Sequence, residues 1–324
     1  MARHPPPQER RSPVTDSEIA VGLAALGRPA YINLGRVDAL PPGREIEAMR
    51  AATYDVLDDA YRAGVRWIDV ARSYGSSEEF LAGWLADRAH ADVTVSSKWG
   101  YRYVGEWKLD AEVHEVKEHT AARFAEQWAE TVGLLGKAVS LYQVHSLTVD
   151  SPLFTDERLV GVLAELAADG VPVGFSTSGP AQADAVRRAF ELEVSGTPVF
   201  SAVQSTWNLL EPSVGPALAE ARAAGKQVLV KETVANGRLV VEPPPTLARI
   251  ARVHEAGPDA VAIAAVLAQD WRPVAVIGPS STAQLAENLV ATKANLTADE
   301  LAELAALAEE PVAYWRHRSC LGWH

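Results

Sequence analysis

The chain has few of the residues that stabilise secreted and membrane proteins. It contains one cysteine, Cys320, in 324 residues, which excludes an internal disulfide framework and fits a reducing cytoplasm. No stretch approaches the roughly 20 apolar residues that a membrane-spanning helix needs. Residues 1–16 are rich in proline and arginine and lack an apolar segment, so we expect a disordered leader rather than a secretion signal. These absences predict a cytoplasmic protein without a membrane partner.

Basic residues are also outnumbered. The sequence has 30 Lys and Arg against 42 Asp and Glu, which gives a formal net charge of −12. This balance argues against a nucleic-acid-binding surface over the whole protein, although it is compatible with a local basic pocket. We expect no nucleic-acid partner and no metal site, and the oligomeric state stays open. The chain does have 48% hydrophobic residues, which is ordinary for a soluble protein with a large core.

Apolar runs of strand length alternate with helix-like segments. Eight runs are expected to be strands: 19–23, 66–69, 93–97, 141–145, 172–175, 202–204, 227–230 and 274–277. Helical patterns cover 44–63, 77–88, 120–135, 156–169, 181–190, 212–224, 259–270, 282–290 and 298–307. Glycines follow several of these helices, where a left-handed residue ends the last turn: Gly64, Gly136, Gly170 and Gly225.

This alternation indicates βαβ units and a parallel sheet. Eight units favour closure into a barrel, which at this length is commonly one domain. The rival is an open doubly wound sheet, which is expected to carry a Gly-x-Gly-x-x-Gly turn after its first strand, and the sequence has none there. We therefore expect a single-domain (β/α)8 TIM barrel over residues 17–324, with a C-terminal tail.

Two connections, 99–119 and 232–246, are longer than the usual few residues. In a barrel, both leave the carboxyl ends of strands, where active sites are built. The first holds Trp99 and Tyr101, which we place in a substrate pocket, with a packing flap as the alternative. The second contains three consecutive prolines, 243–245, which we interpret as a hinge or rigid spacer.

Titratable side chains stand at the ends of three expected strands. Asp69 ends the run 66–69, Lys98 follows 93–97, and His145 ends 141–145. Tyr74 comes five residues after Asp69. Buried charged groups are costly unless they are paired, so four such groups at matching strand ends indicate one shared site. Taken singly, each has a structural explanation as a helix cap, a packed ring, a surface ion-pair partner or a core histidine.

Together these residue types can transfer a proton. A lysine ammonium favours phenolate, so we expect Lys98 to lower the pKa of Tyr74 and Asp69 to keep Lys98 charged and fixed. A tyrosine of this kind can protonate a carbonyl oxygen as hydride reaches its carbon, and His145 can donate a hydrogen bond to the same oxygen. A lysine on a barrel strand also suits a lyase that uses Lys98 as a Schiff base.

An ordered series of six motifs resembles the aldo-keto reductase superfamily. The motifs are Asp-Val-Ala-Arg-Ser-Tyr-Gly-Ser-Ser-Glu (69–78), Val-Ser-Ser-Lys (95–98), Leu-Tyr-Gln-Val-His (141–145), Gly-Phe-Ser (174–176), Gln-Ser-Thr-Trp-Asn-Leu-Leu (204–210) and Ile-Gly-Pro-Ser-Ser-Thr-Ala-Gln-Leu-Ala-Glu-Asn (277–288). The resemblance runs from residue 19 to the C-terminus. It implies a (β/α)8 barrel that reduces aldehydes or ketones with a nicotinamide cofactor, and a catalytic tetrad of Asp69, Tyr74, Lys98 and His145.

The resemblance also implies cofactor contacts. NADP(H) is the expected cofactor, with NAD(H) as the alternative, because Ser280 and Gln284 are neutral where relatives often carry a cation for the 2′-phosphate. Lys231 stands where an aromatic ring usually stacks on the nicotinamide. The other implied contacts are Ser176, Thr177 and Gln204 around the nicotinamide, and Gly278, Glu287 and Asn288 in the last motif.

Three functions follow from these observations. The first is an NAD(P)H-dependent reductase of a small-molecule carbonyl substrate, the second is the Schiff-base lyase, and the third is a non-catalytic NADP(H)-binding regulator. Tyr74 and the cofactor motifs favour the reductase, because a lyase needs neither. The tail 311–324 is aromatic and basic, and it either contributes to substrate specificity, as the resemblance implies, or packs against the outside of the barrel.

Overall fold

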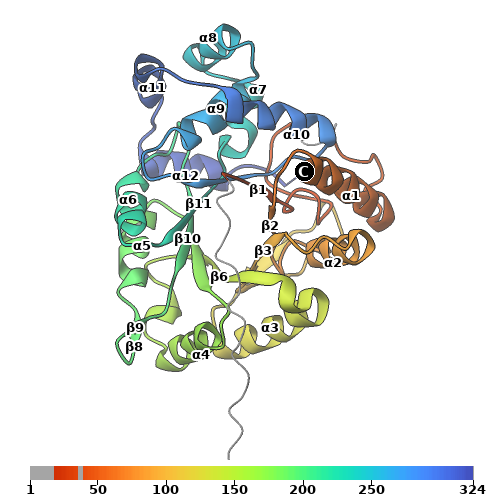
Figure 1. The fold of residues 1–324 in the computed structure, drawn as a ribbon, viewed down its shortest axis with the longest axis vertical. Helices are drawn as coiled ribbons and strands as arrows, with labels where there is room; N and C mark the ends of the chain where they lie inside the picture. Colours follow the sequence, from red (N-terminus) through yellow and green to blue (C-terminus); the bar gives the residue numbers. More distant parts are fainter. Residues whose placement is uncertain (1–17, 36–38, 324) are drawn as a thin grey trace, which may run out of the picture.

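Eight parallel strands close into a barrel, which confirms the expected (β/α)8 fold (Figure 1). The structure is a computed structural model that describes residues 18–35 and 39–323, so the expected leader, 1–16, lies outside the described residues. Around the barrel the strands follow the order β1-β12-β11-β10-β7-β6-β3-β2. Their bounds are β1 Ile19–Gly22, β2 Trp67–Asp69, β3 Thr94–Trp99, β6 Val139–Leu147, β7 Val173–Thr177, β10 Ala202–Thr206, β11 Gln227–Lys231 and β12 Val274–Ile277.

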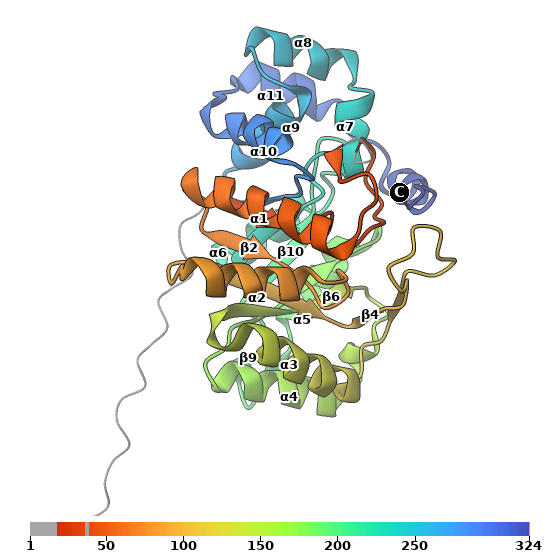
Figure 2. The same cartoon turned by 90° about the vertical axis from the view of Figure 1, so that its right-hand side faces the viewer.

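Helices surround the strands on the outside of the barrel (Figures 1 and 2). The nine that the sequence predicts are α1 Ile46–Arg62, α2 Ser77–Arg88, α3 Ala121–Leu135, α4 Glu157–Ala168, α5 Gln182–Phe190, α6 Gly215–Ala223, α9 Pro258–Leu267, α10 Thr282–Leu289 and α11 Ala298–Ala305. The predicted helix-ending glycines Gly64, Gly136, Gly170 and Gly225 all have positive φ. Among the described residues, no helix has both the length and the apolar character needed to cross a membrane.

Several elements are not predicted by the sequence pattern. They are the helices α7 Arg238–Val241, α8 Pro245–Val253 and α12 Pro311–Ser319, the antiparallel pairs β4 Tyr101–Tyr103 with β5 Glu115–Lys117 and β8 Glu193–Val194 with β9 Thr197–Pro198, and the 3₁₀ turns η2 Gly136–Ala138, η3 Pro152–Phe154, η4 Ala235–Gly237 and η5 Val290–Lys293. Within the proline run, Pro243 and Pro244 lie in the short connection between α7 and α8. Pro245 begins α8, where the missing N–H is not needed.

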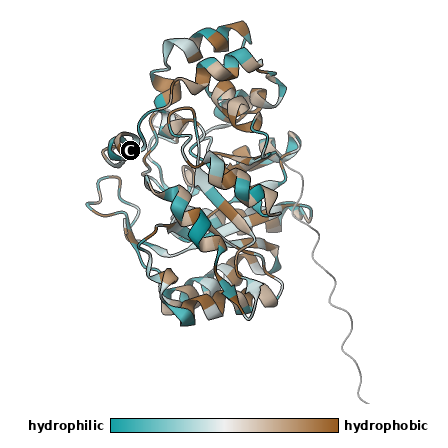
Figure 3. Cartoon of the chain, turned by 90° about the vertical axis from the view of Figure 1, so that its left-hand side faces the viewer, coloured by the Kyte–Doolittle hydropathy of each residue, from teal (hydrophilic) through white to brown (hydrophobic). Residues whose placement is uncertain are grey.

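Side chains along each strand point alternately into the barrel and outward toward the helices. One apolar cluster comes only from strands and fills the barrel interior; it consists of Ala20, Trp67, Leu141, Ala202, Leu229, Val274 and Val276. Their neighbours in the sequence, such as Ile68 and Val230, pack beneath the helices. In Figure 3 the helices carry both hydrophilic and hydrophobic colours, as helices with one face on a core and one face in solvent do.

The inward-facing rows continue into polar residues at the carboxyl end of the barrel. Asp69 comes two residues after Trp67, and Lys231 comes two residues after Leu229, so each faces the same side of its strand as the interior residue before it. Figure 2 shows that the β4–β5 hairpin and α12 lie on the same side of the barrel. The carboxyl ends of the strands in a barrel of this kind commonly hold the active site, so the polar residues there are its candidates.

Candidate active site

A buried ion pair joins β2 and β3. The ammonium of Lys98 contacts the carboxylate of Asp69, and Nζ also donates a hydrogen bond to the Val70 carbonyl oxygen at 3.1 Å. The second oxygen of Asp69 accepts from Ser96 Oγ at 2.6 Å and from Gln204 Nε2 at 3.1 Å. Both charges are thus paired and held by further hydrogen bonds, which is the condition for keeping an ion pair inside a protein.

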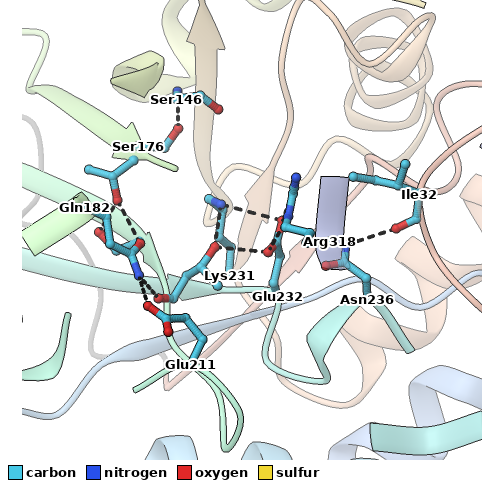
Figure 4. Close-up of polar contacts among 12 residues, drawn as sticks. Ile32, Ser146, Ser176, Gln182, Glu211, Lys231, Glu232, Asn236 and Arg318 are labelled. Atoms are coloured by element: carbon cyan, nitrogen blue, oxygen red, sulfur yellow. Dashed lines mark hydrogen bonds and ion pairs between the residues drawn. The ribbon is translucent and has the colours of Figure 1, made fainter. Parts of the chain in front are cut away.

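His145 projects from a bulge in β6. The register of β6 against β7 shifts between Val144 and Leu147, and Ser146 has a left-handed φ of +55°. Two side chains replace the lost ladder hydrogen bonds. The Ser146 N–H donates to Ser176 Oγ at 2.8 Å, shown in Figure 4, and His119 Nε2 donates to the His145 carbonyl oxygen at 2.8 Å. Bulges re-aim side chains in this way next to functional sites.

The side chains of Tyr74 and His145 are in contact beside the Asp69–Lys98 pair. The Tyr74 hydroxyl lies 3.4 Å from His145 Nε2, and Ser73 Oγ lies 3.3 Å from His145 Nδ1. The ammonium of Lys98 is 4.9 Å from the centroid of the Tyr74 ring. The structure therefore brings Asp69, Tyr74, Lys98 and His145 together, from three strands and the loop that follows β2.

The prediction that Tyr74 has a lowered pKa is wrong. Burial raises the pKa of Tyr74 well above 10, and the Asp69 carboxylate adds to this effect, while Arg28 opposes it. Burial and the charges of Lys98 and Lys231 lower the pKa of His145 well below 6.5. At neutral pH the site thus holds a protonated phenol and a neutral imidazole.

The loop that carries Tyr74 packs closely against the loop after β1. A Cβ on Gly27 would lie 2.3 Å from the Tyr74 carbonyl oxygen and 2.5 Å from Ser77 Cβ, so the contact leaves no room for a side chain. The Ser76 N–H donates to the Gly27 carbonyl oxygen at 2.7 Å. Arg28 donates to the Ser73 carbonyl oxygen at 3.0 Å and pairs with Glu115 of β5 at 2.8 Å. These contacts fix the position of Tyr74.

A cavity opens above these groups. Its lining includes Asp69, Tyr74 and Gln204, and it reaches Gly278 in the loop after β12. The lining also includes Lys231 and Glu232, and the Glu232 carboxylate accepts from Arg318 Nε on α12 at 2.9 and 3.0 Å (Figure 4). The C-terminal helix is therefore bonded to the rim of the cavity.

The chain is similar to known proteins in sequence and in fold. The sequence profile described as "Aldo/keto reductase family" matches residues 42–309. The chain belongs to the aldo/keto reductase family. As a member, it is an NAD(P)H-dependent oxidoreductase, and the family reduces small-molecule carbonyl compounds with NADP(H) or NAD(H).

Individual relatives of this aldo/keto reductase are distant. Aldo-keto reductase str7 of Strobilurus tenacellus is 25% identical over 287 residues, 79% of this chain and 81% of that protein. Norsolorinic acid reductase of Aspergillus flavus is 27% identical over 168 residues, which cover 50% of this chain and 42% of that protein.

Two solved structures share the fold. Aldo-keto reductase AKR11C1 from Bacillus halodurans has a TM-score of 0.66 and 21% identity, covering 93% of this chain and 95% of its own. The glycerol dehydrogenase AKR11B4 from Gluconobacter oxydans has a TM-score of 0.68 and 19% identity, covering 90% and 91%. At these identities the likeness extends to the barrel fold alone.

The cavity is suited to a nicotinamide cofactor. Small residues line it, including Gly22, Ala24 and Ala25, and a Cβ on Gly278 would meet no atom within 4 Å. In the segment that continues from Gly278, the hydroxyl of Ser280 is buried and has no hydrogen-bond partner in the described part of the chain. Ser280 lies just before the N-terminus of α10, where the helix dipole favours an anion.

Other side chains of the segment 278–288 also form hydrogen bonds with residues of the protein. Gln284 Oε1 accepts from the Ser280 N–H at 2.8 Å, and Ser281 Oγ caps α10 by accepting from the Gln284 N–H at 3.2 Å. Asn288 donates to Asp259 at 2.6 Å, and Glu287 is exposed. The segment 278–288 contains no lysine or arginine, so its potential hydrogen-bond donors are hydroxyl, amide and backbone N–H groups.

The side chains of two predicted contact residues, Thr177 and Trp99, point away from the barrel interior. Thr177 follows the inward-facing Ser176, so its side chain points outward, where its hydroxyl bonds to Ser205 Oγ at 2.7 Å and to Gln182 of α5 at 3.3 Å. Trp99 follows the inward-facing Lys98 and packs in the outer core against Phe124, at 5.2 Å between ring centroids.

By contrast, the ring of Tyr101 does lie at the site, 5.0 Å from that of His145. Three residues near the site were not predicted from the sequence: Ser73 and His119, which contact His145, and Arg318, which contacts Glu232. Ser73 stands next to Tyr74 in the first motif, which was a usable signal, whereas His119 and Arg318 contact the site from positions far along the chain.

Proposed function

We propose that the protein reduces an aldehyde or ketone to an alcohol, with Tyr74 as the general acid and NADP(H) as cofactor, NAD(H) being the alternative. The observation that carries this proposal is the 3.4 Å contact between the Tyr74 hydroxyl and His145 Nε2, beside the Asp69–Lys98 pair, with Tyr74 and Asp69 lining the cavity. Two donors on one side of a cavity suit the oxygen of a carbonyl group.

Each residue then has a defined task. A carbonyl oxygen bound beside Tyr74 and His145 accepts hydrogen bonds from both, which orients the substrate. The nicotinamide, when bound, supplies the hydride to the carbonyl carbon. As negative charge develops on the oxygen, Tyr74 transfers its phenolic proton there, and the nearby Lys98 ammonium stabilises the phenolate that remains. Asp69 holds Lys98 in place throughout.

The geometry supports the reductase over the Schiff-base lyase. A lysine that forms a Schiff base must present a neutral amine to the substrate. The Lys98 ammonium instead is fully buried and bonded to Asp69 and to the Val70 carbonyl oxygen. Borohydride treatment of the wild-type protein with a carbonyl substrate tests this point, because a stable adduct on Lys98 in the mass spectrum would favour the lyase.

The Tyr74→Phe variant tests the proposed acid. We expect turnover to fall about 10²–10⁴-fold, because general acid catalysis contributes that much. Binding of NADPH, followed by tryptophan fluorescence, should stay close to wild type. The matched control is Tyr142→Phe, which removes a buried hydroxyl on the outward face of β6 and should leave turnover unchanged. Near wild-type activity of Tyr74→Phe would contradict the assignment.

A panel of aldehydes and ketones defines the substrate class. Consumption of NADPH and NADH is followed side by side at the absorbance of the reduced nicotinamide. Because the loop 278–288 offers no cation to the 2′-phosphate, we expect only a modest preference for NADPH. A strong preference for NADPH would mean that another part of the protein pairs with the phosphate.

A further inference from the structure

We infer that Lys231 biases this protein toward the reduced cofactor, because its ammonium shares a cavity with the nicotinamide ring, which is positively charged when oxidised and neutral when reduced. The inference rests on the proposed function, since it requires the ring to reach Tyr74. Like charges repel, so a fixed cation weakens the binding of the oxidised form and leaves the reduced form nearly unaffected.

The cavity itself determines where the ring lies. Hydride and proton reach adjacent atoms of one carbonyl group, so the nicotinamide must lie in the space that Tyr74 lines. Lys231 lines that same space from the end of β11, together with Asp69 and Gln204. Its charge also reaches the tetrad, because it helps to lower the pKa of His145. The ammonium is therefore within electrostatic reach of any ring that serves Tyr74.

Lys231 is the cation that the cavity leaves incompletely paired. Two carboxylates line the cavity, and each is already paired by a cation from outside the lining, Asp69 by Lys98 and Glu232 by Arg318. The Arg318 guanidinium contacts both oxygens of Glu232, whereas Lys231 Nζ stays 3.7 Å from the nearer one. Among the charged groups of this cluster, three cations thus face two carboxylates, an excess of one positive charge.

The hydrogen bonds of Lys231 do not remove this excess. Nζ donates to Thr206 Oγ1 at 2.7 Å, and Thr206 in turn donates to Glu232 at 3.1 Å (Figure 4). A hydroxyl offers a dipole but no opposite charge. Thr206 therefore fixes the position of the ammonium, at the rim between β10 and β11, without neutralising it.

The charge of Lys231 changes within an accessible pH range. Burial lowers its pKa to about 8; Arg318 from α12 and Lys98 from β3 act in the same direction, and the neighbouring Glu232 opposes them. The other titratable groups at the cavity do not change charge near this pH. Burial raises the pKa of Tyr74 well above 10, and burial together with nearby cations lowers that of His145 well below 6.5. The pKa of Tyr31 is also raised by burial.

The direction of the effect follows. Below about pH 8 the lysine is charged and the oxidised cofactor binds weakly. As the pH rises through this value, the lysine loses its proton and the oxidised cofactor binds more tightly. The reduced cofactor has no ring charge, so its affinity stays nearly constant over the same range.

Quenching of tryptophan fluorescence measures both affinities, without turnover. We expect the ratio of Kd for NADP⁺ to Kd for NADPH to fall about fivefold or more between pH 7 and pH 9.5, as removal of one nearby charge predicts. In Lys231→Met the ratio should already be low at pH 7 and should not change with pH. Lys231→Gln, which keeps a donor for Thr206, serves if the methionine variant is unstable.

Two further variants sharpen the test. Lys226→Met removes the same charge just before β11, at the far end of the barrel, where Nζ donates to the Phe200 carbonyl oxygen at 2.9 Å, and it should behave as wild type. Arg318→Met removes the competing partner of Glu232 and a cation that lowers the pKa of Lys231. The pKa of Lys231 should therefore rise, and the fall in the ratio of the two Kd values should move to higher pH.

Unchanged ratios in both Lys231 variants would overturn the inference. Equal changes for NADP⁺ and NADPH would overturn it too, since they would place Lys231 at a part of the cofactor whose charge is the same in both forms. The proposed function fails separately. If the ratio behaves as expected while no carbonyl compound is reduced, the reductase assignment is wrong and the cation effect stands.

Discussion

The imidazole of His145 is useful to a carbonyl oxygen only if Nε2 carries the proton. A neutral imidazole has one donor and one acceptor nitrogen, and the partner of one nitrogen fixes the role of the other. Ser73 Oγ lies 3.3 Å from Nδ1 and is itself buried. A hydroxyl proton donated to Nδ1 leaves Nε2 as the donor, which faces the Tyr74 hydroxyl. We therefore expect Ser73 to act as a positioning residue for His145, by donating to Nδ1.

Removal of that hydroxyl should lower kcat more than it raises KM. We expect Ser73→Ala to lose about tenfold in kcat, the effect of one hydrogen bond of roughly 1.4 kcal/mol, and Ser73→Thr to recover most of it. Nitrogen-15 NMR of labelled histidine, assigned with a His145→Gln variant, reports the tautomer directly. Ser140→Ala, at the opposite end of β6, is the control. An unchanged tautomer in Ser73→Ala would rule out this role.

Single residues show where sequence reasoning succeeds and where it stops. Asp69, Lys98 and His145 were found because polar groups at strand ends break an apolar pattern. Thr177 and Trp99 were misplaced because a motif gives the position along the chain but not the face of the strand; each follows an inward-facing residue and so points outward. The pKa of Tyr74 was predicted in the wrong direction because burial, which the sequence does not reveal, outweighs the neighbouring charges.

At the scale of elements, the loops after β1 and β2 position Tyr74 through one glycine contact. We expect Gly27→Ala to destabilise the protein by about 1–3 kcal/mol, since its Cβ would overlap the Tyr74 carbonyl oxygen, and to lower turnover as Tyr74 shifts. Urea unfolding and steady-state kinetics measure the two effects.

Gly133→Ala provides the matched control. Gly133 lies inside α3, and an added Cβ would meet no atom within 4 Å. This substitution should instead stabilise the protein by about 0.5–1 kcal/mol, because alanine favours the helix. If both substitutions change the free energy of unfolding in the same way, the close approach at Gly27 does not determine the stability of the protein.

Elements with a strong period were predictable, and those held by distant partners were not. The nine predicted helices have apolar faces or terminating glycines that the sequence displays. α8 was missed because a proline run resembles a turn, although proline also suits the first turn of a helix. The place of α12 depends on the pairing of Arg318 with Glu232, which lies 86 residues earlier in the sequence. No local pattern predicts such a contact.

At the scale of the whole molecule, the Glu232–Arg318 pair links stability to pH. Arg318 and Lys231 lower the pKa of Glu232 from 4.5 to about 2, against the effect of burial. A lowered pKa stabilises the fold above the value of the unfolded chain, and this stabilisation is lost as the pH falls through the folded value. The shift corresponds to about 3 kcal/mol at neutral pH.

Urea unfolding of wild type and Glu232→Gln between pH 7 and pH 2 tests this link. We expect the variant to be less stable by about 3 kcal/mol at pH 7, and the difference to narrow as the pH falls below about 4.5 and approaches 2. Glu220→Gln, which removes an exposed partner of Arg187, should show little difference at any pH. A gap that stays constant with pH would mean that the carboxylate charge of Glu232 is not what stabilises the fold.

The two strands that close the barrel, β1 and β12, are synthesised at the beginning and near the end of translation. β1, Ile19–Gly22, is synthesised early, and the strand that pairs with it, β12, Val274–Ile277, is synthesised about 250 residues later. At about 5–20 residues per second, the growing chain spends on the order of 10–50 s with β1 unpaired on that side. Such an edge invites pairing with other chains, so this interval is when the protein most needs chaperone protection. Arg318 is synthesised later still, and only a chain that has reached it can form the ion pair with Glu232, which lines the cavity.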